Sequence, residues 1–156
     1  MLPIHNILFP TDFSPRATAA FPVACALARD HDAELLILHV RDMPVIAVAE
    51  FGAVPPPERP TRAAVLEKMN DYEPADEKVR FEYIVADGMP GDEIVRTAKE
   101  RGVDLIVMGT HGRTGLSRLV MGSVAEDVMR KAPCPVLTMK APLMASEPVR
   151  AEAAMA

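Results

Sequence analysis

The 156-residue chain has no tryptophan and only two tyrosines and five phenylalanines. Proteins that bind single-stranded nucleic acid stack bases on aromatic side chains, so this scarcity argues against that class. The formal net charge is −5, which gives no general attraction for nucleic acid or for an anionic membrane surface. An anionic ligand would therefore have to be held locally, by particular groups of the chain.

Cysteines and long apolar runs are also scarce. Cys25 and Cys134 lie far apart and match no metal-ligand spacing, so we expect two small buried side chains in a reducing compartment rather than a disulfide. No window approaches the ~18 unbroken apolar residues of a membrane-spanning helix, and residues 1–12 lack the regions of a signal peptide. These absences predict a soluble, cytoplasmic protein that binds neither a membrane nor nucleic acid.

Apolar residues make up 49% of the chain, which is enough for one compact domain with its own core. Four short runs are rich in Ile, Leu and Val with little polar alternation, as in strands buried on both faces: residues 4–10, 34–40, 104–108 and 135–139. A fifth run, Val79–Val85, begins with alternating polar and apolar residues, which is typical of an edge strand.

Four segments between these runs have the spacing and end signals of helices. Ser14 and Pro15 form an N-cap and first-position pair, followed by apolar residues at three- and four-residue intervals. The other candidates are residues 61–72, 91–101 and 123–131. Strands that alternate with helices predict a single-domain α/β fold, with an open, mainly parallel five-stranded sheet and helices on both faces.

Two segments do not fit this alternation. Residues 43–60, MPVIAVAEFGAVPPPERP, are apolar and then proline-rich, and we expect a long loop after the second strand. Such a loop is often functional, although a tolerated insertion fits the sequence equally well. Residues 141–156 have small side chains and no strand period, so we expect a loosely ordered tail after a domain of residues 1–140.

The most informative stretch is GTHGRTGLSRLVMGSV, residues 109–124, which directly follows the strand-like DLIVM. In an open parallel sheet, ligands bind beyond the carboxyl ends of the strands. Gly109 and Gly112 would let the backbone approach a ligand and adopt positive φ. Gly122 and Ser123 begin a helix whose unpaired N–H groups and dipole suit a phosphate. The glycines could instead only shape a turn and a cap, but four features in register after a buried strand favour a phosphate cradle.

The spacing of this stretch matches neither GxxxxGK[ST] nor GxGxxG, which excludes a P-loop and the dinucleotide fingerprint. Arg113 could pair bidentately with a phosphate or be merely solvated. Asp12, after the first strand, could cap the next helix or contact a ligand, and we favour the contact. His111 shows neither an orienting partner nor a nucleophile, so we assign no catalytic residue. No HxxH or HExxH spacing predicts a metal site.

The glycine stretch resembles the nucleotide-binding motif of the universal stress protein family, G-x2-G-x9-G-[ST], with Gly109, Gly112, Gly122 and Ser123 at the matching positions. The segments ILFPTDFS, ELLILHV and APCPVLTM also look like family segments, so the resemblance covers roughly residues 3–140. It implies a Rossmann-like, adenine nucleotide alpha hydrolase-like fold with sheet order 3-2-1-4-5. It also implies a homodimer that pairs through the last strand, Pro135–Lys140.

The resemblance further implies a set of ligand contacts. Asp12 would lie near the adenosine moiety, with Pro10 and Thr11 in the same turn, and the backbone of Val40 would hydrogen-bond the adenine edge. The implied ribose and phosphate contacts are Gly109, Gly112, Gly122, Ser123 and Val124. ATP is the implied ligand, and a divalent cation such as Mg²⁺ or Mn²⁺ could accompany it, held mainly by phosphates and water.

Three functions remain open from the sequence. The first is a regulatory protein of the stress response, in which ATP orders residues 109–122 and changes a surface that an unidentified protein partner reads. The second is an enzyme, a slow ATPase or a nucleotidyl or phosphoryl transferase, because the same cradle could stabilise charge on a transferred phosphate. The third is a nucleotide-independent dimeric interaction or chaperone-like protein. A complete cradle without an evident catalytic set favours the first.

Overall fold

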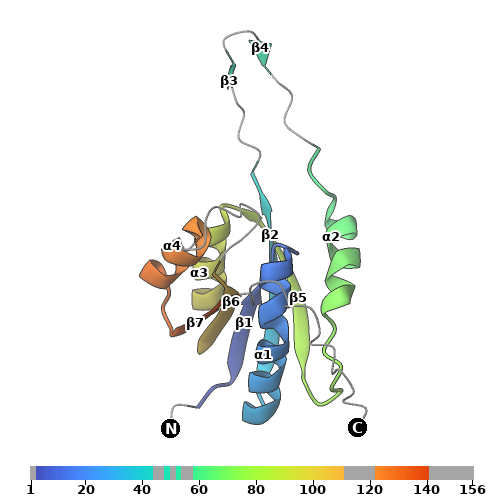
Figure 1. The fold of residues 1–156 in the computed structure, drawn as a ribbon, viewed down its shortest axis with the longest axis vertical. Coiled ribbons are helices and arrows are strands. Elements are labelled where there is room, and N and C mark those ends of the chain that lie inside the picture. Colours follow the sequence, from blue (N-terminus) through green and yellow to red (C-terminus); the bar gives the residue numbers. More distant parts are fainter. Residues whose placement is uncertain (1–2, 44–47, 50–51, 54–57, 111–121, 141–156) are drawn as a thin grey trace, which may run out of the picture.

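The computed structural model describes residues 3–43, 48–49, 52–53, 58–110 and 122–140. At its centre is a five-stranded parallel sheet in the order β5-β2-β1-β6-β7 (Figure 1). The strands are β1 (Asn6–Pro10), β2 (Glu34–Asp42), β5 (Phe81–Gly88), β6 (Leu105–Gly109) and β7 (Val136–Met139). Counted along the chain within this sheet, the order is 3-2-1-4-5, so the predicted fold class is confirmed.

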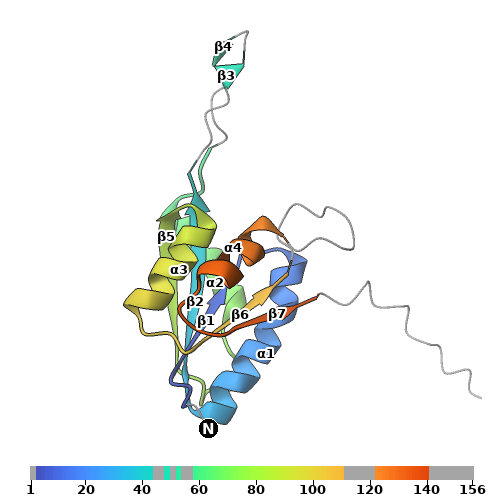
Figure 2. The same cartoon turned by 90° about the vertical axis from the view of Figure 1, so that its left-hand side faces the viewer.

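Helices cover both faces of this sheet (Figure 2). One face packs against α1 (Pro15–His31), α2 (Arg62–Met69) and the 3-10 turn η1 (Asn70–Tyr72), and the other against α3 (Pro90–Glu100) and α4 (Ser123–Lys131). Ile7 and Phe9 pack on the first side and Leu8 on the second. Because the central strands are buried on both faces, their sequences show no polar alternation. None of the described helices is long and apolar enough to cross a membrane.

The turn between β1 and α1 is held by local polar contacts. Ser14 Oγ accepts a hydrogen bond from the Ala17 N–H at 3.2 Å, and Pro15 occupies the first helical position, as predicted. Phe13 adopts φ +64°, a left-handed conformation that bulky residues rarely take, and its N–H donates to Thr11 Oγ1 at 3.0 Å. The turn thereby holds Thr11 in place at the carboxyl end of β1.

The two edge strands differ from each other. β5 lies at one edge of the sheet, so the alternating pattern of Val79–Val85 is confirmed as an edge signal. β7 lies at the other edge, and the prediction that residues 135–139 are buried on both faces is wrong. Leu137 is 39% exposed, because β7 pairs with β6 alone and no other strand of the described chain lies beside it.

Residues 43–60 contain more than the expected loop. β3 (Val48–Ala49) pairs antiparallel with β4 (Gly52–Ala53), and this hairpin stands away from the main sheet (Figures 1 and 2). An antiparallel pair needs only a short chain reversal, so it can form locally without the rest of the fold. The expectation of a loop without secondary structure is therefore corrected.

The two cysteines are separated by the sheet. Cys25 packs against the α1 side and Cys134 against the α3 and α4 side, and both are free thiols. They are half-buried rather than buried as predicted. Burial raises the pKa of Cys25 to about 11, and burial together with the charge of Asp104 raises the pKa of Cys134. Both side chains therefore remain protonated thiols at neutral pH.

Candidate functional site

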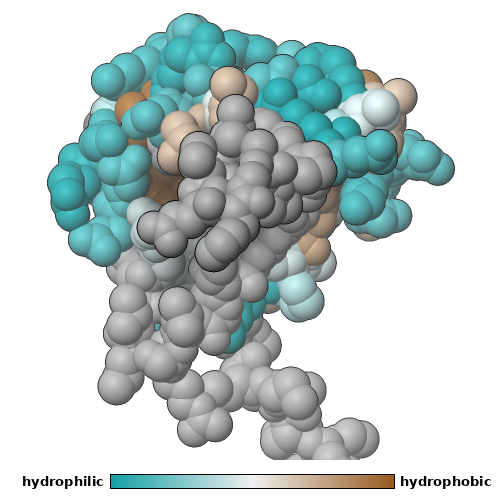
Figure 3. Space-filling view, turned by 90° about the horizontal axis from the view of Figure 1, so that it is seen from above, coloured by the Kyte–Doolittle hydropathy of each residue, from teal (hydrophilic) through white to brown (hydrophobic). Residues whose placement is uncertain are grey.

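A cavity of about 530 Å³ lies at the carboxyl ends of β1, β2 and β6. The N-terminal ends of α3 and α4, at Pro90 and Gly122, form another part of its described walls. The strand order reverses between β1 and β6, which is where open α/β sheets bind ligands. Figure 3 looks down on this end of the molecule, where the described surface is largely hydrophilic with smaller apolar patches. The volume suits a ligand of nucleotide size.

The predicted site residues that the structure describes all line this cavity: Pro10, Thr11, Asp12, Val40, Gly109, Gly122, Ser123 and Val124. Gly112 and Arg113, together with His111, lie outside the described residues. The fold thus gathers at one cavity residues that are far apart in the chain.

Asp12 has the turn role that was one of its two interpretations. Its Oδ1 accepts a hydrogen bond from the Ser14 N–H at 2.9 Å, which orients the carboxylate at the start of α1. Thr11 is fixed beside it, because its N–H donates to the Leu38 carbonyl at 2.8 Å and its own carbonyl oxygen lies 2.9 Å from His39 Nδ1. Since Asp12 also lines the cavity, the turn role and a ligand contact are compatible.

Val40 offers main-chain hydrogen-bonding groups to the cavity. Residues of a parallel strand direct their N–H and C=O alternately toward the two neighbouring strands. The Leu38 carbonyl accepts from Thr11, so Leu38 faces β1, and Val40, two residues later, faces the same way. The last pair between β1 and β2 is Pro10 with Leu38. Val40 therefore has no strand partner on this side within the described chain, which leaves a donor and an acceptor side by side.

Gly109 serves the packing of the fold. The prediction that it takes positive φ is wrong, because the positive-φ glycines of the described chain are Gly88 and Gly102. A Cβ atom at Gly109 would lie 2.9 Å from the carbonyl oxygen of Arg16 and 3.3 Å from the backbone nitrogen of Ala17. The backbone of α1 thus passes too close to β6 for a side chain at this position.

The start of α4 is partly satisfied by the protein itself. The N–H of Gly122, the N-cap residue, donates to the Thr110 carbonyl at 2.7 Å, so the expected unpaired amide is not found at Gly122. The first intrahelical bond of α4 runs from Glu126 N–H to the Gly122 carbonyl at 3.0 Å. The amides of residues 123–125 precede it, and Gly122 has no side chain to cap them. These amides, at the positive end of the helix dipole, belong to residues that line the cavity.

One wall of the cavity was not predicted from the sequence. Asp42 at the end of β2 and the segment Glu58, Arg59 and Pro60 line it. The letters PPPERP look like a proline-rich connection and carry no motif. Only the long-range contacts of the fold bring this segment back to the end of β2.

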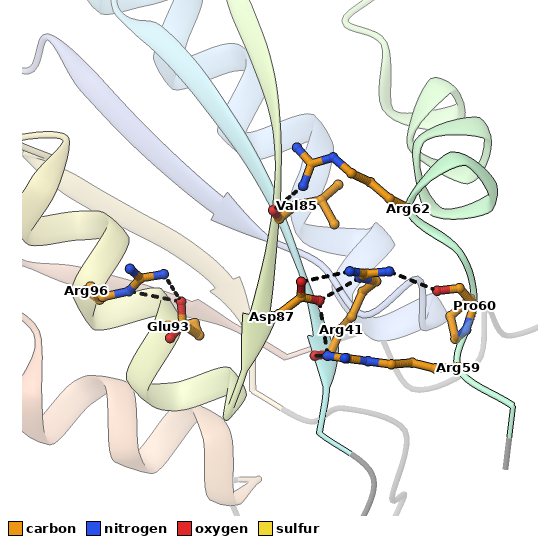
Figure 4. A network of polar contacts seen from close by, with 8 residues as sticks. All are labelled: Arg41, Arg59, Pro60, Arg62, Val85, Asp87, Glu93 and Arg96. Atoms are coloured by element: carbon orange, nitrogen blue, oxygen red, sulfur yellow. Dashed lines mark hydrogen bonds and ion pairs between the residues drawn. The ribbon is translucent and has the colours of Figure 1, made fainter. Parts of the chain in front are cut away.

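Asp87 ties that wall to the edge of the sheet (Figure 4). Arg41 of β2 lies opposite Asp87 of β5 and donates to its two carboxylate oxygens at 2.6 and 2.7 Å. Arg59 Nη2 donates to the Arg41 carbonyl at 2.7 Å and to Asp87 Oδ1 at 3.1 Å, and Arg41 Nη1 donates to the Pro60 carbonyl at 3.3 Å. The hydrogen bonds from Arg41 hold the pKa of Asp87 below its usual value, so the carboxylate is charged at neutral pH.

Comparison with known proteins identifies relatives over nearly the whole domain. The model of the universal stress protein family matches residues 3–140. Universal stress protein MJ0531 of Methanocaldococcus jannaschii is 35% identical over 140 residues, which cover 88% of this chain and 82% of the relative. The solved structure of protein MJ0577 from the same organism has a TM-score of 0.68 and 31% identity, covering 90% of this chain and 98% of that one.

Two further solved universal stress proteins contain ligands. One is in complex with cAMP, with a TM-score of 0.64 and 24% identity over 89% of this chain and 98% of that one. The other, from Archaeoglobus fulgidus, is in complex with dAMP, with a TM-score of 0.55 and 21% identity over 88% and 98% of the two chains. At these identities the likeness shows a shared fold. Both ligands are adenine nucleotides.

Proposed function

Because this chain belongs to the universal stress protein family, we propose that its cavity binds an adenine nucleotide, with ATP as the ligand, and that the protein is a regulatory binding module. One observation carries the proposal: a single cavity is lined both by Val40, whose main-chain groups have no strand partner on the β1 side, and by the first turn of α4, which has no side-chain cap. The family members solved with cAMP and dAMP support adenine nucleotides as the ligand class.

Val40 is the proposed contact for the base. An amino donor next to a ring-nitrogen acceptor occurs on two edges of adenine, and the C=O and N–H of Val40 are their complement. Guanine carries O6 where adenine carries its amino group. The O6 of guanine would face the carbonyl oxygen of Val40. Because both atoms are acceptors, neither would receive a hydrogen bond. The geometry at the end of β2 therefore favours adenine.

The start of α4 is the proposed contact for the phosphates. Unsatisfied amides at a helix N-terminus and the positive end of the helix dipole stabilise an anion. Gly112 and Arg113, in the segment that joins β6 to α4, are proposed to complete these contacts. No group of three or more His, Cys, Asp or Glu side chains in the described chain is placed to hold a metal ion. A divalent cation would therefore be held mainly by the phosphates and water.

A binding role rather than dedicated catalysis fits the residues of the wall. His39 is engaged in the structure, with its ring stacked on Phe13 at 4.4 Å between centroids and Nδ1 bonded to the Thr11 carbonyl. The described part of the wall presents the carboxylates of Asp12, Asp42 and Glu58. We propose that bound ATP shifts the protein toward a conformation whose surface a partner recognises.

Isothermal titration calorimetry with ATP, ADP, AMP and adenosine tests this function. We expect saturable binding of all four ligands, tightest for ATP, and much weaker binding of GTP. Identification by mass of an adenine nucleotide that co-purifies with the protein would be independent support. Absence of binding at millimolar nucleotide would remove the proposal, and sustained ATP turnover by the pure protein would favour an enzyme.

We also propose that residues 1–140 form the universal stress protein domain and residues 141–156 a C-terminal tail. The family match ends at residue 140, which supports this boundary. The tail lies outside the described residues.

The exposed edge at β7 supports a proposed homodimer through Pro135–Lys140. A strand that pairs on one side only presents unpaired backbone groups, and pairing with a symmetry mate covers them. Leu137 is an exposed large apolar side chain on this edge. Pairing with a second copy would bury it.

Aspartate at Leu137 should convert the dimer to a monomer, because two symmetry-related carboxylates would meet in an apolar seam. We expect the dimer dissociation constant to rise by about 100-fold or more, as follows from burying an unpaired charge. Light scattering over a concentration series measures this change. Met89→Asp is the matched control, since Met89 is 60% exposed and follows β5 at the opposite edge of the sheet. A wild-type protein that is monomeric throughout would refute the dimer.

A further inference from the structure

We propose that Arg59 recognises the base of the bound nucleotide. Its Nε–H donates to one of the adenine ring nitrogens, N1 or N7, namely the one that Val40 does not contact. This inference rests on the proposed function and extends the site to a residue outside the glycine motif. Arg59 lines the cavity and lies between the β3–β4 hairpin and α2. It would be a specificity-determining contact in a segment that looks like a connection.

The first observation is a donor without an acceptor. Arg59 Nε is buried and has no hydrogen-bond partner in the described chain, whereas Nη2 of the same side chain makes two hydrogen bonds. Buried donors in native proteins nearly always have a partner, in the protein, in water or in a ligand. Since Arg59 borders a cavity of about 530 Å³, a ligand in that cavity can supply the missing acceptor.

The second observation is position. Arg59 Nη2 reaches the carbonyl oxygen of Arg41, the residue that follows Val40 in β2, at 2.7 Å. Arg41 is adjacent to Val40 in sequence, although by the alternation along β2 its carbonyl faces β5 whereas the main-chain groups of Val40 face β1. The amides assigned to the phosphates follow β6, which is two strands away from β2 in the sheet. Arg59 thus lies on the β2 side of the cavity, the side that Val40 also lines, rather than on the β6 side.

The third observation is charge. Arg41 and Arg59 share the single carboxylate of Asp87, which neutralises only one of the two positive charges. The carboxylates of Asp42 and Glu58 on the same wall can offset the other. Asp42 and Glu58 on the same wall would repel a phosphate. A carboxylate can accept from the adenine amino group, and the Arg59 Nε–H can donate to the ring nitrogen beside it. Guanine would place its O6 acceptor against those carboxylates. The wall therefore selects adenine as well as holding it.

Arg59→Lys tests the contact, because lysine keeps the charge and can still pair with Asp87 but lacks Nε–H. We expect adenosine and ATP each to bind about tenfold more weakly, measured by calorimetry. Arg62→Lys is the matched control: Arg62 donates to the Val85 carbonyl at 3.0 Å in the same region, but it does not line the cavity. This variant should bind like wild type. Thermal unfolding shows whether each variant is folded, and Arg59→Met serves as a second variant that lacks Nε–H.

Two analogues, 1-deazaadenosine and 7-deazaadenosine, identify the acceptor. For the analogue that lacks the contacted nitrogen, wild type and Arg59→Lys should bind within about twofold of each other, while the other analogue keeps the tenfold difference. Three results would overturn the inference: no effect of Arg59→Lys on adenosine, an effect on ATP alone, or the same loss with both analogues. If wild type binds neither adenosine nor ATP, the proposed function itself fails, which is a different result from an unchanged Arg59 variant.

Discussion

Valine at Gly109 should lower the free energy of unfolding by about 3 kcal/mol, although β-branched residues normally stabilise strands. Strand propensity spans only ~1 kcal/mol, so it is the smaller effect. The larger effect is steric, because a Cβ at this position would lie 2.9 Å from the Arg16 carbonyl oxygen and 3.1 Å from its carbonyl carbon. These are backbone atoms in the first turn of α1, which cannot rotate away as a flexible side chain would. The helix would have to shift off β6.

Urea unfolding of Gly109→Val, Gly109→Ala and Gly102→Ala measures this effect. Gly102 has φ +57° and nothing within 4 Å of a built Cβ, so alanine there should cost only the ~1 kcal/mol of a left-handed backbone. The expected order of stability loss is Gly109→Val, then Gly109→Ala, then Gly102→Ala. A Gly109→Val protein as stable as the Gly102→Ala protein would show that α1 moves freely against β6.

The role of Gly109 shows what the sequence could not reveal. A glycine directly after DLIVM, before a glycine-rich segment, was interpreted as a backbone position opened for a ligand. The clash is with Arg16, which is distant in the sequence, and no local pattern encodes a helix crossing a strand at that point. Gly109 therefore fits the family motif for a packing reason, whatever ligand the cavity holds.

The sheet was predictable because a strand that is buried on both faces has a recognisable run of apolar residues in its sequence. The runs that became β1, β2 and β6 are apolar at successive positions, since each has a helix layer on both sides. β7 has the same apolar letters but lies at an edge, and its exposure depends on what pairs with it. The strand order came from the family resemblance, because periodicity alone does not say which strands are neighbours.

The part of the candidate site that lies at the strand ends was predictable from the sequence. The part formed by residues 58–60, which lie against the end of β2, was missed. Asp12 and Val40 each follow or end a buried run, and the carboxyl ends of parallel strands meet at one edge. Arg59 has no such signal, because its place in the wall is set by hydrogen bonds to Arg41 and Asp87 on two different strands. A charged residue in a proline-rich connection gives no indication of those partners.

Aspartate at Gly122 should weaken ATP binding by about 100-fold or more, while adenosine binding stays within about twofold of wild type. Gly122 has φ −59° and ψ 148°, which any residue can adopt, so the backbone does not require glycine here. Aspartate is also a better N-cap than glycine by a few tenths of a kcal/mol, so stability should hold or rise slightly. Its carboxylate would occupy the amides that we assign to the phosphates and would place a negative charge beside them.

Calorimetry with ATP and adenosine, and urea unfolding of the same variants, test this prediction together. Gly122→Asn separates the two causes, because asparagine can cap the amides without adding charge; we expect about a tenfold loss for ATP. The pattern is the reverse of that expected for Arg59→Lys, which should weaken adenosine and ATP alike. Unchanged ATP binding by Gly122→Asp would mean that the phosphates do not lie at the start of α4. An equal loss of adenosine would mean that the substitution closes the cavity as a whole, since adenosine has no phosphate for the new charge to repel.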